Sequence, residues 1–419
     1  MKFRELSIEE FNSFSDNYKY KSIYQTSEYG LLMEKIGFKF SFVGLVENNE
    51  IIAATLVLIK TESGFNYAYA PRGFLLDYDN PELLKIFTKC IKVYLRKKKV
   101  MAIKLNPMIT KNIYNFNTNK INKLENYDQV FASLIKNNYT HLGYNNFFEA
   151  LNPRCEAIIN LNKSNTELFN NLKKEFKTKI RSSIKNGVRV YKGDDSNLED
   201  LYPLLKSKYK KSIKYFNEFY DIFSKRGMVD IYYTKLDTKI YLEHVQRQLA
   251  KYEREIYNLN NLIIRSGKSR NKIINKKLNI DNYLNQYKNE LIKATLDLRN
   301  NPNGIITSCI ITLKQKDEIT IFFDGYDNKY KKLNSKHLLI WQLIEIYKSQ
   351  GFNKFNLGGM SNMAVDTKKY VGLNEFKSNF GSEMYEYAGD FELIANKRSY
   401  NLYRNYVPLK KLIIDKINK

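Results

Sequence analysis

Lys377 lies in a stretch whose residue types could stabilise a developing oxyanion. Phe376 precedes it, Phe380 follows it, and Gly372 and Gly381 bound the stretch. Aromatic side chains on both sides could hold the ammonium partly away from water, where it would stabilise an oxyanion that develops on an ester. The same spacing fits a surface lysine between two core phenylalanines, and on spacing alone this second interpretation is the better supported one.

A second group of cations lies on one predicted helix. Lys177, Arg181 and Lys185 are four residues apart and share one face, and Lys179 adds a further charge. Residues 176–193 contain no Asp or Glu. Because such a face repels itself until an anion neutralises it, phosphate binding is favoured over a merely solvated face.

The segment Tyr69-Ala70-Pro71-Arg72-Gly73 ends a predicted strand with a proline and a glycine around an arginine. Such a turn can present the guanidinium at the carboxyl end of a strand, where it would clamp an anionic substrate. An ion pair between Arg72 and Asp77 explains the same residues equally well.

Other kinds of site have little support. Acetyltransferases usually hold the coenzyme A diphosphate on a glycine-rich turn before a helix, but the corresponding turns here, 71–80 and 327–335, contain one glycine and none. Coenzyme A is therefore not expected as the acyl carrier. The three cysteines and three histidines lack the spacing of a disulfide framework or of metal ligands, so we expect reduced thiols, no metal and no other cofactor.

The framework that must position these residues is a predicted α/β pattern that occurs twice. Each copy has strands, a long helix and a further strand. The first copy comprises Ser41–Glu47, Glu50–Lys60, Phe65–Ala70, Pro81–Lys98 and Val100–Asn106, and the second comprises Gly304–Leu313, Glu318–Tyr326, Ser335–Gln350 and Lys354–Leu357. Both copies look like an acetyltransferase-type unit. The polar stretch Thr110–Tyr127 is expected to be a loop or short helix, and Glu167–Asn186 one basic helix.

Residues 239–298 break this pattern with two runs of apolar heptads. The heptad positions are Leu242, Val245, Leu249, Tyr252, Ile256, Leu259 and Ile263, then Ile273, Lys277, Ile280, Leu284, Tyr287 and Leu291. The polar break 265–270 contains Gly267, which lets the chain reverse, so we expect an antiparallel hairpin about 35 Å long at ~1.5 Å per residue. A long binding partner and simple bracing or dimerisation explain this arm equally well.

The fold class is therefore α/β (α+β), with two tandem acetyltransferase-like units and a coiled-coil hairpin inserted in the second. We assign residues 1–153 to the first unit, with 396–419 packing back on it, 154–238 and 299–395 to the second unit, and 239–298 to the arm.

The charge of the chain indicates polyanionic partners. Lys and Arg number 69 against 44 Asp and Glu, which gives a net charge of +25 and a pI near 9.5. Nucleic acid, anionic lipid and phosphorylated substrates all fit, although a general compositional bias toward Lys, Asn and Ile explains part of the surplus. The N-terminus lacks the apolar stretch of a signal peptide, so we expect a soluble, cytoplasmic protein whose charge permits docking at the inner face of the membrane.

The chain resembles the Fem family of peptidoglycan-bridge aminoacyltransferases over nearly its whole length. The resemblance is carried by the arm and by Tyr24–Tyr29, Tyr69–Asp77, Lys104–Pro107, Lys177–Arg181, Phe355–Gly359, Phe376-Lys377 and Phe380-Gly381. It implies an enzyme that moves glycine, alanine or serine from aminoacyl-tRNA to the stem-peptide amine of lipid II or UDP-MurNAc-pentapeptide. Aminoacyl-tRNA would be the co-substrate.

The resemblance also implies roles for particular residues. Lys35 and Arg181 would hold the diphosphate of the precursor, and Lys377 beside Phe376 would stabilise the tetrahedral intermediate or the leaving oxygen of the tRNA. Tyr69, Arg72, Lys177 and Lys179 belong to the matching substrate-binding segments. Asn106 stands where relatives often carry an acidic residue, and an amide cannot accept the proton of the attacking amine, so the general base is left open.

Two other functions fit the sequence. A transferase of the same fold could act on protein N-termini from charged tRNA, and a non-catalytic tRNA- or membrane-binding scaffold would use the charge and the arm. Monomers and homo-oligomers both stay open, because the seams of the arm can pair within one chain or between chains. Related bridge-forming transferases are further candidate partners.

Overall fold

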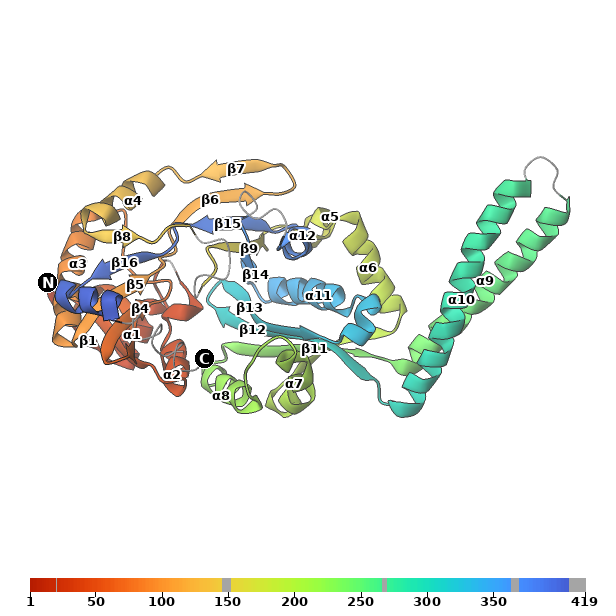
Figure 1. Ribbon diagram of the computed structural model, residues 1–419, viewed down its shortest axis with the longest axis horizontal. Helices are drawn as coiled ribbons and strands as arrows, with labels where there is room; N and C mark the ends of the chain where they lie inside the picture. The colour runs from red at the N-terminus through yellow and green to blue at the C-terminus, as the bar shows by residue number, and fades with distance from the viewer. Residues whose placement is uncertain (20, 145–151, 266–269, 363–368, 407–419) are drawn as a thin grey trace.

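The computed structural model describes residues 1–419 apart from 20, 145–151, 266–269, 363–368 and 407–419. Its strands form two sheets that lie side by side, and a helical hairpin projects away from the second sheet (Figure 1). Within the described part of the chain, no helix combines the length and the apolar character needed to cross a bilayer.

The first unit is a seven-stranded sheet of order β1-β2-β3-β4-β5-β16-β8. β4 and β5 run parallel, and the other neighbours run antiparallel. The strands are β1 (Lys2–Leu6), β2 (Lys39–Glu47), β3 (Glu50–Glu62), β4 (Phe65–Ala70), β5 (Val100–Leu105), β8 (Tyr139–His141) and β16 (Phe391–Ile394).

Helices cover both faces of the first sheet. α1 (Ile8–Ser15) and α2 (Ser27–Lys35) bury one core cluster against it, and α3 (Pro81–Lys97) and α4 (Tyr127–Lys136) bury another. The sequence places α3 clearly, because Asn80 caps its N-terminus and Pro81 takes the first helical position.

The second unit is a nine-stranded sheet of order β10-β11-β12-β13-β14-β9-β15-β6-β7. Only β13 and β14 run parallel among the paired strands of this sheet that the structure describes. The strands are β6 (Thr110–Asn115), β7 (Lys120–Lys123), β9 (Cys155–Asn160), β10 (Val188–Gly193), β11 (Val229–Leu236), β12 (Ile305–Gln315), β13 (Glu318–Tyr326), β14 (Lys354–Met360) and β15 (Glu383–Tyr387).

The two faces of the second sheet carry different helices. Ile310 and Ile311 are neighbours on β12 and point to opposite faces, and they belong to different core clusters. The cluster of Ile310 contains residues of α5 (Asn165–Asn171), α6 (Lys174–Lys185) and α11 (Ser335–Ser349), and α12 (Val371–Ser378) packs against it through Phe376. The cluster of Ile311 contains residues of α7 (Leu198–Lys206) and α8 (Ile213–Ser224).

The two units repeat one topology. β3, β4, α3 and β5 of the first unit correspond in order and direction to β12, β13, α11 and β14 of the second. In each unit an antiparallel pair leads into a helix that returns the chain to a parallel strand. The predicted tandem α/β fold is confirmed.

The arm consists of α9 (Thr238–Arg265) and α10 (Arg270–Asn300), which pack along their length. Tyr252 stacks on Tyr283 at 5.7 Å between ring centroids, and the Tyr241 hydroxyl donates to Glu290 at 2.6 Å. These contacts make the helices antiparallel, as the heptads predict. The predicted reversal around Gly267 lies outside the described residues.

Three predicted features are wrong. Thr110–Tyr127 forms the hairpin β6–β7, which joins the second sheet by pairing with β15, and β16 joins the first sheet. The predicted boundary at residue 153 is therefore wrong, because β6 and β7 precede it and yet belong to the second sheet. The predicted second unit also wrongly includes residues 391–394, which form β16 of the first sheet. Glu167–Asn186 forms two helices, because Leu172 is extended and buried between α5 and α6.

The C-terminal segment returns to the first unit as far as the structure describes it. The Tyr403 ring lies 5.7 Å from the Phe65 ring of β4, and the Tyr403 hydroxyl donates to Glu62 at 3.3 Å. Residues 407–419, the rest of the predicted packing segment, lie outside the described residues.

Candidate active site

The candidate site lies where the two parallel strands of the second sheet stop pairing. β13 and β14 pair only over Glu318–Thr320 and Lys354–Asn356. Beyond these residues β14 carries a bulge between Asn356 and Gly359. Gly358 in this bulge has φ +81°, which favours glycine, and a Cβ there would lie 3.5 Å from the Nζ of Lys377. The bulge and α12 therefore bring Lys377 to the end of the paired region.

Lys377 is held in a desolvated position. Its Nζ donates to the Gly359 carbonyl at 2.6 Å. Burial lowers the pKa of this ammonium to about 7, the carboxylate of Asp324 opposes the shift, and the nearby cations Lys336 and Lys208 add to it. A lysine with a pKa near neutrality can both carry charge and donate a proton under ordinary conditions. Lys377 is thus suited to acid catalysis as well as to charge stabilisation.

Asp324 of β13 gathers two further cations beside Lys377. Lys208, after α7, donates to its Oδ1 at 2.5 Å, and Lys336, in the first turn of α11, donates to its Oδ2. These two ammonium groups hold the pKa of Asp324 well below its usual range despite burial. Because one carboxylate faces three lysines, the cluster keeps a net positive charge. Such a cluster attracts a substrate that carries phosphate.

A cavity of about 320 Å³ opens beside this cluster, at the start of α11. Its lining residues are Tyr326, Lys331, Asn334, Ser335, Lys336, His337, Gly372, Leu373 and Phe376. Ser335 and Lys336 are the first two residues of α11, so their N–H groups have no partner within the helix. A helix N-terminus with two lysines beside it suits a phosphate group.

Phe376 and His337 form an aromatic wall of this cavity. Their ring centroids lie 5.2 Å apart, and both rings contact Phe176 of α6 and Phe380. Burial and the nearby lysines lower the pKa of His337 to about 4, so its ring is neutral at pH 7. The wall offers apolar ring surface next to the phosphate-binding helix end, a combination that suits a nucleotide.

Arg72 and Asn106 lie at the boundary between the units. The Oδ1 of Asn106 accepts hydrogen bonds from the Arg72 backbone N–H at 2.8 Å and from the Tyr69 hydroxyl at 3.1 Å. The Arg72 guanidinium is buried, pairs with Glu156 and stacks 4.7 Å over the Tyr387 ring. Arg72 was predicted to clamp an anion or to pair with Asp77. Instead, its charge is neutralised by Glu156, which leaves anion binding to other residues.

Glu156 continues this buried network. The amide of Asn356 donates to Glu156 at 2.9 Å and to Glu318 at 3.0 Å, so it joins the two carboxylates. Burial raises the pKa of Glu318 to about 7, and the charge of Glu156 adds to the effect. The network links Arg72 of the first unit to the strands that carry the Lys377 site.

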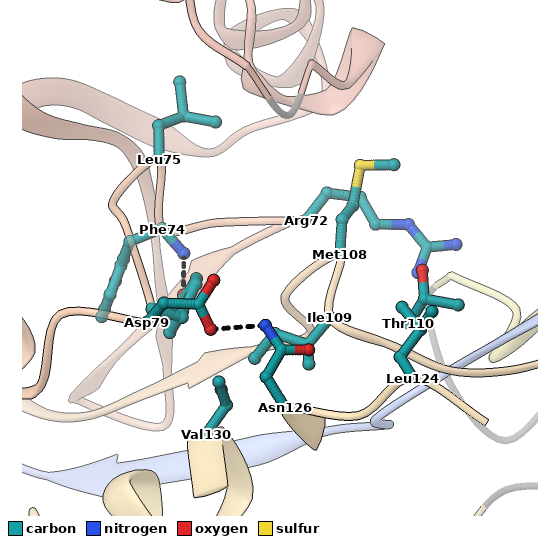
Figure 2. A pocket seen from close by; sticks show the side chains of 11 residues that line it. Arg72, Phe74, Leu75, Asp79, Met108, Ile109, Thr110, Leu124, Asn126 and Val130 are labelled. Carbon is teal, nitrogen blue, oxygen red and sulfur yellow. Dashed lines mark hydrogen bonds between the residues drawn. The ribbon is translucent and has the colours of Figure 1, made fainter. Parts of the chain in front are cut away.

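A smaller cavity of about 80 Å³ lies on the first unit beside Arg72 (Figure 2). Met108, Ile109 and Thr110 line it after β5, and Asn126 donates to Asp79 at 2.6 Å at another part of its wall. The lining is mostly apolar with a few polar groups. Because ligand pockets usually measure roughly 300–1,000 Å³, this cavity can accept only one small group of a larger substrate.

The other predicted cations do not come together. Lys35 ends α2, which packs against α8, whereas Arg181 lies on α6, which packs against α11 on the opposite face of the second sheet. One diphosphate cannot reach both, so the predicted joint role of Lys35 and Arg181 is wrong. The physical reason is that β12 and its neighbours separate them.

The basic face of α6 has local partners. Lys177 and Arg181 both lie over the Phe169 ring, at 5.5 and 5.4 Å, and the Lys177 Nζ donates to the Asn170 carbonyl at 3.1 Å. Lys179 pairs with Glu175 one turn earlier. The predicted shared face of Lys177 and Arg181 exists, but it does not adjoin Lys377 through any contact among the described residues. Its phosphate-binding role stays a prediction.

Sequence reasoning missed Asp324, Lys208 and Lys336. Asp324 falls in the predicted strand Glu318–Tyr326, where an acidic residue near the end of an apolar run is a signal for a polar site. Lys208 and Lys336 carried no such signal, because they are distant in sequence and meet only through the fold. Among the described residues, no group of three or more His, Cys, Asp or Glu side chains is placed to hold a metal ion.

Comparisons with known proteins agree with this architecture. The profile of the FemAB family matches residues 6–407. The aminoacyltransferase FemA of Staphylococcus epidermidis (strain ATCC 35984) is 26% identical over 428 residues, which cover 98% of this chain and 100% of the relative. The aminoacyltransferase FemA of Staphylococcus aureus (strain MRSA252) is 25% identical over 427 residues, covering 98% and 99%.

A solved structure shows the same fold. The crystal structure of FemX superposes with a TM-score of 0.73 at 21% sequence identity, over 96% of this chain and 99% of that chain. The similarity extends over both units, so the whole framework that positions Lys377 is shared.

Proposed function

The chain belongs to the FemAB family, and on this premise we propose that it moves an amino acid from aminoacyl-tRNA to the stem-peptide amine of a peptidoglycan precursor at Lys377. The predicted family is thereby confirmed, and so is the predicted reaction class, because this family adds amino acids to the peptidoglycan precursor to form interpeptide bridges. The chain is an aminoacyltransferase. The donor, the form of the acceptor and the residue roles are the proposal.

The observation that carries the proposal is the lysine cluster at the cavity at the start of α11. Lys336 lines this cavity and donates to Asp324, the carboxylate whose charge acts on Lys377. Phosphates at the 3′ end of a tRNA would bind Lys331, Lys336 and the first N–H groups of α11, and its terminal base would rest on the wall of Phe376 and His337. This arrangement would place the ester bond near Lys336 and Asp324, and therefore near the Lys377 ammonium that Asp324 attracts.

The reaction needs alignment and charge stabilisation. The neutral amine of the acceptor attacks the ester carbonyl carbon, a C–N bond forms, and the C–O bond to the tRNA ribose breaks. Lys377 stabilises the oxyanion and donates a proton to the leaving ribose oxygen. The proton lost by the amine passes to water, since Asn106 already accepts two hydrogen bonds and has no basic group. An aminoacyl ester supplies its own activation.

The acceptor would approach from the first unit. The cavity beside Arg72 has room for one small side chain of a stem peptide, and Lys35 offers a cation at the exposed end of α2 for the precursor diphosphate. Lipid II and UDP-MurNAc-pentapeptide share this diphosphate chemistry. The +25 charge of the chain suits both the tRNA and work at the anionic inner face of a membrane.

The test is a transfer assay with purified protein, a panel of charged tRNAs and a purified precursor. Lys377→Ala should lower the rate by roughly 100- to 1,000-fold, the effect of losing a group that stabilises the oxyanion. Lys136→Ala, which removes an exposed lysine on α4, is the control and should transfer normally.

Three outcomes would contradict the proposal. Full activity of a folded Lys377→Ala variant would remove this lysine from the mechanism. Transfer to an acceptor protein in preference to the precursor, when both are offered, would show that the acceptor is a protein N-terminus. Absence of transfer from every charged tRNA would favour the scaffold function.

A further inference from the structure

The distal part of the arm has a one-sided charge. We call residues 256–264 of α9 and 270–280 of α10 the arm tip. The arm tip contains four Lys and Arg, namely Arg270, Lys272, Lys276 and Lys277, and no Asp or Glu. In the arm tip, Arg270, Lys272 and Lys276 are exposed, and Lys276 lies 3.4 Å from Glu255 at its boundary. The arm tip is therefore strongly cationic.

The arm tip also exposes aliphatic side chains. Leu262 is 52% exposed, Ile264 82% and Leu278 56%. The seam between the helices is closed by other residues, since Leu259 and Ile280 are buried at 4% and 9% exposure. The exposed aliphatic residues are thus not needed to hold the hairpin together, and their contact with water is unfavourable.

We propose that the arm tip binds the surface of an anionic lipid bilayer. Leu262 and Ile264 point to opposite sides of α9, so both enter the boundary between headgroups and acyl chains when the arm meets the bilayer end-on. The surrounding Lys and Arg side chains then contact lipid phosphates. Basic residues next to exposed aliphatic residues are the pattern of interfacial membrane-binding segments. This inference goes beyond the proposed reaction, because it concerns a surface remote from Lys377 and holds whatever the enzyme transfers.

The geometry of the arm supports this occupant. Figure 1 shows the arm projecting away from both sheets, so its end is the part of the described chain farthest from the second sheet along that direction. The 28 residues of α9 span about 42 Å at 1.5 Å per residue. The two sheets would then lie at a distance from the bilayer of up to this length. A tilt of the arm at its base would shorten that distance.

Two other occupants fit the observations less well. RNA would be attracted by the charge, but its phosphates gain nothing from Leu262 or Ile264. A second copy of the arm would cover the aliphatic residues, but two tips without acidic residues repel each other. A bilayer with anionic lipid offers phosphates to the basic side chains and an apolar interior to the aliphatic side chains.

The experiment measures binding of the full chain to phosphatidylglycerol-containing vesicles by sedimentation, without tRNA or precursor. The double variant Leu262→Gln/Ile264→Gln should bind roughly 30-fold more weakly, because two aliphatic side chains no longer enter the bilayer. The matched control is Ile292→Gln/Leu296→Gln, which changes two aliphatic residues of α10 near the base, 63% and 49% exposed, and should bind normally. All four positions are exposed, so both variants should fold.

Charge is tested separately. Arg270→Gln/Lys272→Gln should also weaken vesicle binding, and wild-type binding should fall with added salt and on vesicles of phosphatidylcholine alone. Equal vesicle binding by the wild type and Leu262→Gln/Ile264→Gln would overturn the proposal. So would a loss of RNA-hairpin binding in that variant while its vesicle binding is unchanged. Because these readouts require no transfer, failure here and failure of the proposed reaction are distinguishable.

Discussion

At the scale of single residues, the chemistry depends on the protonation of Lys377. Burial, together with the nearby cations Lys336 and Lys208, lowers the pKa of Lys377 to about 7, and the carboxylate of Asp324 opposes this shift. A group whose pKa lies near 7 is charged below that pH and neutral above it. If the ammonium form stabilises the oxyanion, activity attributable to Lys377 must decrease as pH rises through about 7.

Lys377→Arg tests this role, because arginine stays protonated at all relevant pH values. The ratio of kcat/KM for charged tRNA between the wild type and Lys377→Arg should be constant below pH 6 and fall about tenfold per pH unit well above 7. Ionisation of the acceptor amine affects both enzymes equally and cancels in the ratio. A ratio that rises above pH 7 would instead make the neutral amine of Lys377 a general base.

Sequence reasoning reached Lys377 only by family resemblance. The spacing of Phe376, Lys377 and Phe380 is compatible with a surface lysine. It does not reveal the burial of the ammonium or its hydrogen bond to the Gly359 carbonyl, 18 residues earlier. Arg72 illustrates the same limit. Its turn was recognised, but its partner Glu156 is 84 residues away and was not foreseen.

At the scale of elements, the bulge of β14 positions the Gly359 carbonyl that holds Lys377 in the site. Gly358 has φ +81°, and a Cβ there would make an ordinary van der Waals contact with the Lys377 ammonium at 3.5 Å. Gly358→Ala should therefore destabilise the fold by about 1–2 kcal/mol through backbone strain. It should also reduce kcat, because relief of this strain would shift the bulge whose Gly359 carbonyl holds Lys377.

Gly351 provides a matched control for this variant. It has φ +88° and open space around the position of a Cβ, so Gly351→Ala meets the same backbone strain without touching the site. Chemical denaturation should show similar losses of stability in the two variants, and only Gly358→Ala should transfer slowly. Equal kcat values for the two variants would show that the conformation of the bulge does not affect catalysis.

The elements that sequence reasoning predicted best are those with strong local signals. The strands β3, β4 and β13 and the helix α3 have periodic apolar residues with clear caps or turns. β6 was missed because its sequence, Thr-Lys-Asn-Ile-Tyr-Asn, is polar and half-buried throughout, and its pairing with β15 determines its conformation. The break between α5 and α6 was missed for a similar reason. There the backbone N–H of Lys173 donates to the carbonyl of Asn379, just beyond α12 and 206 residues away in the sequence.

At the scale of the molecule, the two units behave as one body. Ile23 and Leu32 of the first unit are buried in the same cluster as Phe219 of α8. Arg226 of the second unit pairs with Asp16 and Glu28 of the first. This shared core fixes the first unit relative to the Lys377 site. The arm is different, since only its base joins a core, through Tyr241, Val245 and Ala294.

Replacing residues 254–281 with a short glycine-rich turn therefore removes the arm tip without touching the core. The melting temperature of the body should change little, because Tyr241, Val245 and Ala294 remain in place. If the arm tip anchors the enzyme to lipid, transfer to soluble UDP-MurNAc-pentapeptide should be unchanged. Transfer to lipid II in anionic vesicles should fall by roughly the 30-fold expected for lost membrane binding.

The two acceptors separate the roles that the arm can play. Both reactions use the same charged tRNA and the same Lys377, so a defect in tRNA binding would reduce both rates equally. A defect confined to lipid II can arise only from the encounter with the membrane, because the stem peptide and its amine are common to the two acceptors. If both transfer rates fall equally, the arm binds the tRNA. If both rates are retained, the arm is a structural brace that contacts neither substrate.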